Sequence, residues 1–167
     1  MSFYSRYIFP RVIDFAMSNN DMRKVRTAVL GDVSGDIFEI GFGTGLNLPY
    51  YPEGVTKLTA IDSENMLEDR VAKRIASCPL PVTRMRLDAQ GRLPFEDHTF
   101  DTVVTTLTLC SIPDTAAALA EVEARRAGAG AAALEGVGAE ALGATRPAAE
   151  DAREEVAAQA HLAQHVV

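Results

Sequence analysis

Alternating glycines behind an acidic residue are the part of this sequence best suited to holding a ligand. Glu39 is followed by Gly41, Gly43 and Gly45, each separated by one residue. Glycine adopts positive φ at little cost and lets a ligand approach the main chain closely. The carboxylate ahead of these glycines favours a cationic ligand group. We therefore predict a binding loop here, and a tight strand-to-helix turn is the alternative explanation.

A dinucleotide-binding loop does not match this spacing. The pattern G-x-G-x-x-G beginning at Gly41 needs its third glycine at position 46, where the chain has Leu46. The carboxylate of Glu39 would also repel a pyrophosphate. An NAD-dependent oxidoreductase is therefore a distant alternative.

Two aspartates stand where later predicted strands end. Asp62 follows the predicted strand 57–61, about 20 residues beyond the loop, and Asp88 follows the predicted strand 82–87. An acidic residue about 20 residues beyond a glycine-rich loop, such as Asp62, strengthens the interpretation of the glycines as a binding loop. Either aspartate could instead cap a turn or a helix, and that alternative stays open.

Strands alternate with helices along most of the chain. The predicted strands are 36–40, 57–61, 82–87 and 101–107, and the predicted helices are 3–18, 21–30, 64–76 and 115–123. Ser63 is the expected cap of the third helix. This alternation predicts an α/β fold with a Rossmann-like, doubly wound parallel sheet. Ligands of such sheets bind beyond the carboxyl ends of the strands, where the glycine loop, Asp62 and Asp88 all fall.

Three segments in the right order resemble the class I S-adenosylmethionine-dependent methyltransferase superfamily, especially its type 11 branch. They are EIGFGTGLNLPYYP, LTAIDSENML and DAQGRLPFEDHTFDTVVTTLTLCSIPD. The resemblance implies S-adenosyl-L-methionine as the cofactor, with the glycine loop against its methionine part. It further implies that Asp62 binds the ribose hydroxyls, that Asp88 and Ala89 flank the adenine, and that Met66 packs on the adenine face. The expected cofactor contacts are Glu39, Gly41, Phe42, Gly43, Thr44, Gly45, Asp62, Ser63, Met66, Asp88, Ala89, Thr106 and Leu107.

The resemblance predicts a methyltransferase acting on a small-molecule, lipid or thiol acceptor. Methyl transfer from a sulfonium is a direct displacement that needs alignment more than acid or base groups. Accordingly, no catalytic residue and no metal ligand is assigned. A catalytically inactive cofactor-binding or interaction protein is the main alternative.

Residues 127–167 differ in composition from the residues before them. They are rich in alanine and glycine and contain no aromatic residue. Near Arg126 the resemblance ends, and we interpret the chain as truncated or frameshifted there. We expect residues 1–126 to form the cofactor-binding domain and residues 127–167 to be a helical or disordered tail outside the family. The sheet would then be incomplete, with about four strands and none from the tail.

The charge and composition of the chain indicate which classes of partner, and which cellular compartment, to expect. The formal net charge of −7 argues against a general nucleic-acid binder. The 2 cysteines lie far apart, which argues against a disulfide framework and favours the cytoplasm. No apolar run approaches the roughly 20 residues that a membrane span requires. The expected partner is therefore the methyl acceptor, with no nucleic acid and no stable membrane insertion.

Overall fold

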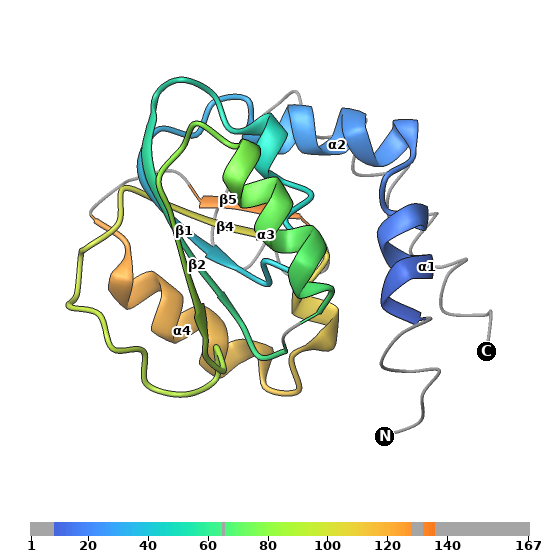
Figure 1. Cartoon of the computed structure of the whole chain (residues 1–167). Helices are drawn as coiled ribbons and strands as arrows, with labels where there is room; N and C mark the ends of the chain where they lie inside the picture. The colour runs from blue at the N-terminus through green and yellow to red at the C-terminus, as the bar shows by residue number, and fades with distance from the viewer. Residues whose placement is uncertain (1–8, 65, 128–131, 136–167) are drawn as a thin grey trace.

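The computed structural model describes residues 9–64, 66–127 and 132–135, which form one parallel sheet flanked by helices (Figure 1). The 5 strands are β1 (Gly35–Ile40), β2 (Val55–Asp62), β3 (Val82–Arg86), β4 (Thr102–Thr106) and β5 (Ala132–Glu135). They lie in the order β3-β2-β1-β4-β5, and all neighbours are parallel. This order runs outward in both directions from β1 and confirms the predicted doubly wound sheet.

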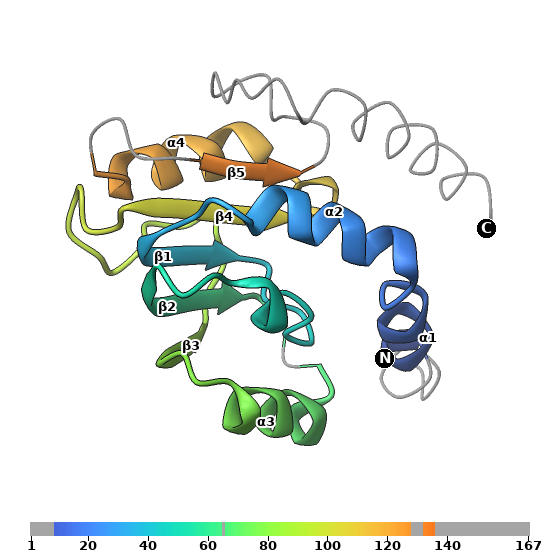
Figure 2. The same ribbon diagram turned by 90° about the horizontal axis from the view of Figure 1, so that it is seen from above.

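Helices cover both faces of the sheet. The α-helices of the described residues are α1 (Phe9–Ala16), α2 (Asn20–Leu30), α3 (Glu68–Ser77) and α4 (Thr115–Arg125). Side chains of α2 and α3 pack on one face with Ile37 and Leu58, whereas α4 packs on the other face with Phe38. Helix α1 lies apart from these layers, beyond the carboxyl ends of the strands (Figure 2).

The alternation of β1 side chains explains the two apolar layers. Ile37 and Phe38 are both fully buried, and they point to opposite faces because successive strand side chains alternate. On the α4 side, the Phe38 ring stacks on Phe100 at a centroid distance of 4.8 Å, and Phe95 packs edge-on against both rings. A strand buried on both faces is rigid, so the loop that follows β1 starts from a fixed point.

The fifth strand corrects the expectation that no strand follows residue 127. Ala132–Glu135 pairs in parallel with Val103–Thr106 of β4. The edge of β4 presents unpaired N–H and C=O groups, and pairing with them uses only backbone atoms. Low strand propensity of an alanine-rich segment therefore did not prevent pairing. Among the residues that the structure describes, the sheet has 5 strands rather than about four. The expectation of helix or disorder for residues 136–167 lies outside the described residues.

Candidate functional site

The glycine loop begins where β1 ends and continues the pairing with β2 for two residues. The amides of Gly41 and Phe42 both donate to the carbonyl of Ile61, at 2.9 and 3.2 Å. The φ angles of Gly41, Gly43 and Gly45 are +79°, +55° and +77°, which confirms the predicted positive φ. Residues with a side chain rarely adopt a positive φ, so the backbone conformation of the loop requires glycine at these alternating positions.

The three glycines differ in what a side chain would meet. A Cβ atom at Gly41 would overlap with the side chain of Thr108, and one at Gly45 would lie 3.1 Å from the Phe42 ring. At Gly43 it would have no neighbouring atom within 4 Å in the part of the chain that the structure describes. Packing therefore accounts for two of the glycines, whereas Gly43 borders open space beside the loop.

Asp62 connects the end of β2 to this open position. Its Oδ2 accepts from the Gly43 amide at 2.7 Å, and its Oδ1 accepts from the Glu64 amide at 3.0 Å. The side chain is half-buried. Because each carboxylate oxygen can accept a further hydrogen bond, Asp62 retains capacity toward a ligand while it holds the loop.

Glu39 lies beneath the loop in a buried polar network. It is 1% exposed, and its two oxygens accept from Asn47 Nδ2 at 2.7 Å and from the Tyr51 hydroxyl at 3.0 Å. Asn47 also donates to Thr106 Oγ1 at 2.9 Å and accepts from Arg26 Nε at 3.0 Å. Burial raises the pKa of Glu39 to about 7, against the opposing effects of the two hydrogen bonds and the Arg26 charge. The network joins the ends of β1 and β4.

Sequence reasoning missed the partners of Glu39. Asn47 and Tyr51 both lie within the segment GTGLNLPYY, eight and twelve residues beyond Glu39. Arg26 lies on α2 and carried no motif signal. A polar residue within an otherwise apolar stretch, such as Asn47, is the one available hint of a buried partner.

The segment between β2 and α3 departs from the predicted helix start. Helix α3 begins at Glu68 rather than at residue 64, so Ser63 does not cap it. Leu67 precedes the helix with a φ of +48°. The amide of Glu64 is bonded to Asp62, which makes a turn where the helix was expected. Met66 is half-buried in this longer loop.

The ends of β3 and β4 hold the remaining expected contacts. Asp88 is exposed, and its Oδ1 accepts from the Gln90 amide at 3.0 Å, which lowers the pKa of Asp88. Its observed role is thus that of a turn cap, while Ala89 is buried. Leu107 follows β4 with a φ of +54°. A non-glycine residue in this conformation is uncommon and occurs preferentially at functional sites.

Phe42 and Thr44, the residues between the glycines, both point away from the open side. Phe42 is 3% exposed and packs in the core with side chains of α2 and α3. Thr44 is buried and donates its hydroxyl to Asp14 of α1. Sequence reasoning assigned no role to Asp14. Burial alone would raise the pKa of Asp14, but hydrogen bonds from Arg74, Thr44 and Arg70 outweigh it and lower the pKa to about 2.

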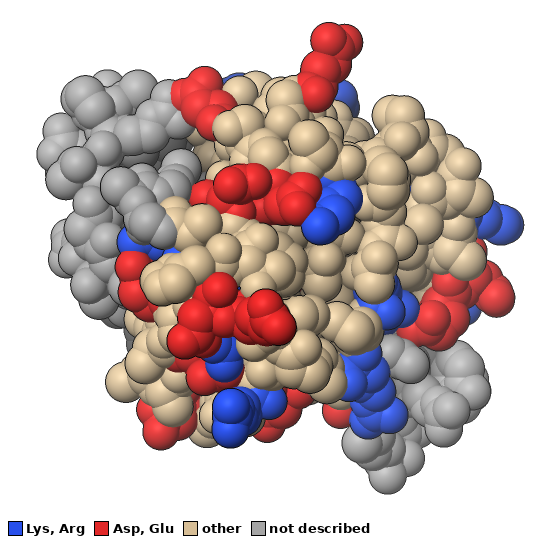
Figure 3. Space-filling model, turned by 90° about the vertical axis from the view of Figure 1, so that its left-hand side faces the viewer, with Lys and Arg blue, Asp and Glu red and all other residues tan. Residues whose placement is uncertain are grey.

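The surface carries charges of both signs. Figure 3 shows acidic and basic side chains interspersed over one face, without an extended basic patch among the side chains drawn in colour. Within the described ranges, no helix is long and apolar enough to cross a membrane. The same residues contain no group of three or more acidic, histidine or cysteine side chains arranged to hold a metal ion.

Comparison with known proteins identifies similarities over much of the chain. Residues 38–133 match the family model described as a methyltransferase domain. Phosphatidylethanolamine N-methyltransferase of Cereibacter sphaeroides is 32% identical over 101 residues, which are 60% of this chain and 49% of that protein. The chain thus spans about half the length of the curated relative it matches.

Solved structures share the fold at low sequence identity. An S-adenosyl-L-methionine-dependent methyltransferase from Methanococcus maripaludis superposes with a TM-score of 0.64 at 18% identity, covering 90% of this chain and 68% of that chain. The [4+2]-cyclase SpnF superposes with a TM-score of 0.56 at 19% identity, covering 66% of this chain and 42% of that chain. Since a cyclase is among them, the fold by itself does not fix the reaction.

Proposed function

Because the chain belongs to the methyltransferase domain family, we propose that it binds S-adenosyl-L-methionine and transfers its methyl group to a small-molecule, lipid or thiol acceptor. The observation that carries this proposal is the open space at Gly43, bordered by the half-buried carboxylate of Asp62. The buried carboxylate of Glu39 lies just beneath the same loop.

The charge of this site favours a cationic ligand over a phosphate. Asp62 and Glu39 are both acidic. Burial is the main cause of the raised pKa of Glu39, and the negative charge of Asp62 raises this pKa further, so the two carboxylates repel each other. A ligand with an ammonium and a sulfonium group would relieve this repulsion. A pyrophosphate would increase it, and Leu46 replaces the third glycine of the dinucleotide pattern.

Each part of the site then has a proposed role. The loop Gly41–Gly45 lies against the methionine part of the cofactor, and Asp62 accepts from the ribose hydroxyls with its remaining acceptor capacity. Asp88 and Ala89 flank the adenine, and Met66 packs on its face. Ser63 follows Asp62 in the same loop, and Thr106 and Leu107 lie near the reacting methyl group at the end of β4.

When bound, the cofactor supplies a methyl group on a positively charged sulfur. The chain contributes alignment and exclusion of water rather than proton transfer. Strands β1 and β4, both buried, provide a rigid base, and Leu107 directs the chain away from β4 with its positive φ. Aligned reactants in such a site avoid much of the entropic cost of meeting in solution.

An amine-bearing lipid is the first acceptor to test. The relative from Cereibacter sphaeroides is named a phosphatidylethanolamine N-methyltransferase, which supports a lipid amine among the possible acceptors.

Isothermal calorimetry with S-adenosyl-L-methionine tests cofactor binding. We expect the wild type to bind and Gly43→Val to lose binding, because the added side chain fills the open space. Gly43→Ala is the matched control, since it opposes the same positive φ with less bulk. Equal affinity of wild type and Gly43→Val would show that the loop is only a turn.

Methyl transfer is then measured with phosphatidylethanolamine vesicles, small amines and thiols. Formation of S-adenosyl-L-homocysteine with one acceptor supports the enzyme. Cofactor binding without transfer to any acceptor would favour the non-catalytic alternative, and binding of NAD instead would favour the oxidoreductase.

A further inference from the structure

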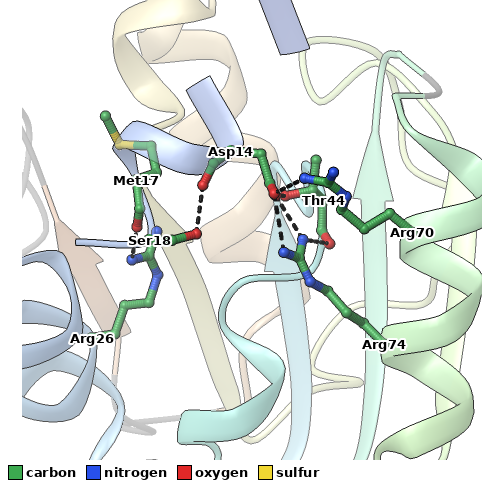
Figure 4. Close-up of polar contacts among 7 residues, drawn as sticks. All are labelled: Asp14, Met17, Ser18, Arg26, Thr44, Arg70 and Arg74. Atoms are coloured by element: carbon green, nitrogen blue, oxygen red, sulfur yellow. Dashed lines mark hydrogen bonds and ion pairs between the residues drawn. The ribbon is translucent and has the colours of Figure 1, made fainter. Parts of the chain in front are cut away.

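The carboxylate of Asp14 is buried where α1 meets the glycine loop. Its side chain is 3% exposed and accepts a hydrogen bond from the Thr44 hydroxyl. Arg70 Nη1 lies 2.5 Å from Oδ2. Arg74 reaches both oxygens, with Nη1 2.7 Å from Oδ1 and Nη2 3.1 Å from Oδ2. Figure 4 shows these side chains converging from α1, the loop and α3.

Arg74 also holds the backbone of the loop. Its Nη1 lies 2.7 Å from the carbonyl oxygen of Thr44. Two polar groups of Thr44 are therefore engaged by residues outside the loop, the hydroxyl by Asp14 and the carbonyl by Arg74. Hydrogen bonds to charged groups are shorter and stronger than neutral ones, and burial of the carboxylate limits screening by salt.

Thr44 adjoins the position that borders the open space. The Gly43 amide is held by Asp62 of β2, and the next residue is held by α1 and α3. The peptide between Gly43 and Thr44 is thus fixed at both ends. Without the contacts of Asp14 and Arg74, this peptide would be held by Asp62 and by the turn in which the Gly45 amide donates to the Phe42 carbonyl at 2.9 Å, and the shape of the site beside Gly43 would vary more.

We propose that Asp14 and Arg74 are positioning residues for the cofactor loop, and that docking of α1 through Asp14 strengthens cofactor binding. This inference rests on the proposed function, since it takes the loop to be the cofactor site. Coupling of this kind is reciprocal, so bound cofactor also strengthens the docking of α1. An exposed ion pair would have little effect, whereas Asp14 is buried and contacts the loop directly.

Four substitutions separate the contacts. Asp14→Asn removes the charge, and Arg74→Gln removes the guanidinium. Arg74→Lys keeps a cation but loses the paired donors, and Thr44→Val removes only the hydroxyl. Asp21→Asn is the matched control because it makes the same change of charge at an exposed position. Asp21 forms a surface ion pair with Lys24, at a distance of 3.5 Å.

Calorimetry and hydrogen exchange give two independent readouts. We expect Asp14→Asn and Arg74→Gln to weaken S-adenosyl-L-methionine binding about tenfold, Arg74→Lys to recover part of that loss, and Asp21→Asn to bind as the wild type. In the wild type the cofactor should slow amide exchange in α1. In Asp14→Asn this effect on α1 should disappear, while the amides of 36–40 stay protected as a check on folding.

The outcomes separate this inference from the proposed function. Wild-type affinity in Asp14→Asn, with residues 36–40 protected, would overturn the positioning role and leave the proposed function intact. If the wild type itself does not bind the cofactor, the proposed function fails. The positioning role is then judged on the amides of Thr44 and Gly45: faster exchange in Asp14→Asn supports it, and unchanged exchange overturns it. If Asp14→Asn unfolds, Thr44→Val replaces it under the same criteria.

Discussion

The substitution Glu39→Gln should destabilise the folded chain at pH 5 and stabilise it at pH 8, relative to the wild type. The pKa of Glu39 is about 7 in the folded chain against an ordinary value of 4.5. The folded state therefore holds this proton more tightly than the unfolded state. Stability from the protonated form is complete below the ordinary pKa and is lost as the pH rises through 7. Glutamine has no such proton, so the variant lacks this loss.

The magnitude follows from the size of the shift. From 4.5 to about 7, at 1.36 kcal/mol per pKa unit, the total is about 3 kcal/mol, and roughly 2–3 kcal/mol of it falls between pH 5 and pH 8. Glutamine can still accept from Asn47 and donate to the Tyr51 hydroxyl, so we expect it to be about 1 kcal/mol less favourable than protonated Glu39, independently of pH. We expect Glu39→Gln to be less stable than the wild type at pH 5 and more stable at pH 8.

Urea unfolding at pH 5, 6, 7 and 8 measures this difference. The groups whose pKa is lowered, Asp14, Asp36, Asp88 and Glu121, titrate below this window and do not contribute to it. Arg26 and Asp62, the charged groups acting on Glu39, are unchanged in the variant. Glu53→Gln, at an exposed position, is the control. Parallel stability curves for wild type and Glu39→Gln would refute the argument that burial controls this carboxyl group.

Further outcomes test other parts of the site and the sheet. Asp62→Ala should weaken S-adenosyl-L-methionine binding by about 1–3 kcal/mol in calorimetry, since it removes a charged acceptor, and unchanged affinity would exclude Asp62 from the site. Cofactor affinity should rise from pH 6 to pH 8 as Glu39 ionises near the cationic ligand, and Glu39→Gln should abolish that rise. Gly41→Ala should lower the free energy of unfolding by about 2–3 kcal/mol because it overlaps with Thr108, against about 1 kcal/mol for Gly43→Ala; equal losses would contradict this difference. In hydrogen exchange, amides of 132–135 at the sheet edge should exchange faster than those of 36–40, and equal protection would show that β5 is as firmly held as β1.

Local patterns predicted the elements and their order along most of the chain. Short strand-like segments bounded by turn residues placed β1, β2, β3 and β4 within two residues of their observed ends, because the signal for a strand is contained in a few consecutive residues. Parallel connections then required the glycine loop, Asp62 and Asp88 to lie at one edge of the sheet. The positive φ of the glycines likewise follows from residue type, since few other residues accept it.

Contacts between distant segments could be read only from the tertiary structure. Glu39 looked like a ligand-facing carboxylate, yet its oxygens accept from Asn47 and Tyr51 in the core. Asp14 carried no motif, and its partners Arg70 and Arg74 lie 56 and 60 residues away. The strand at Ala132–Glu135 formed despite its composition. In each case the interaction depends on which groups the fold brings within hydrogen-bonding distance, and that distance is set by packing of whole elements rather than by any spacing along the chain.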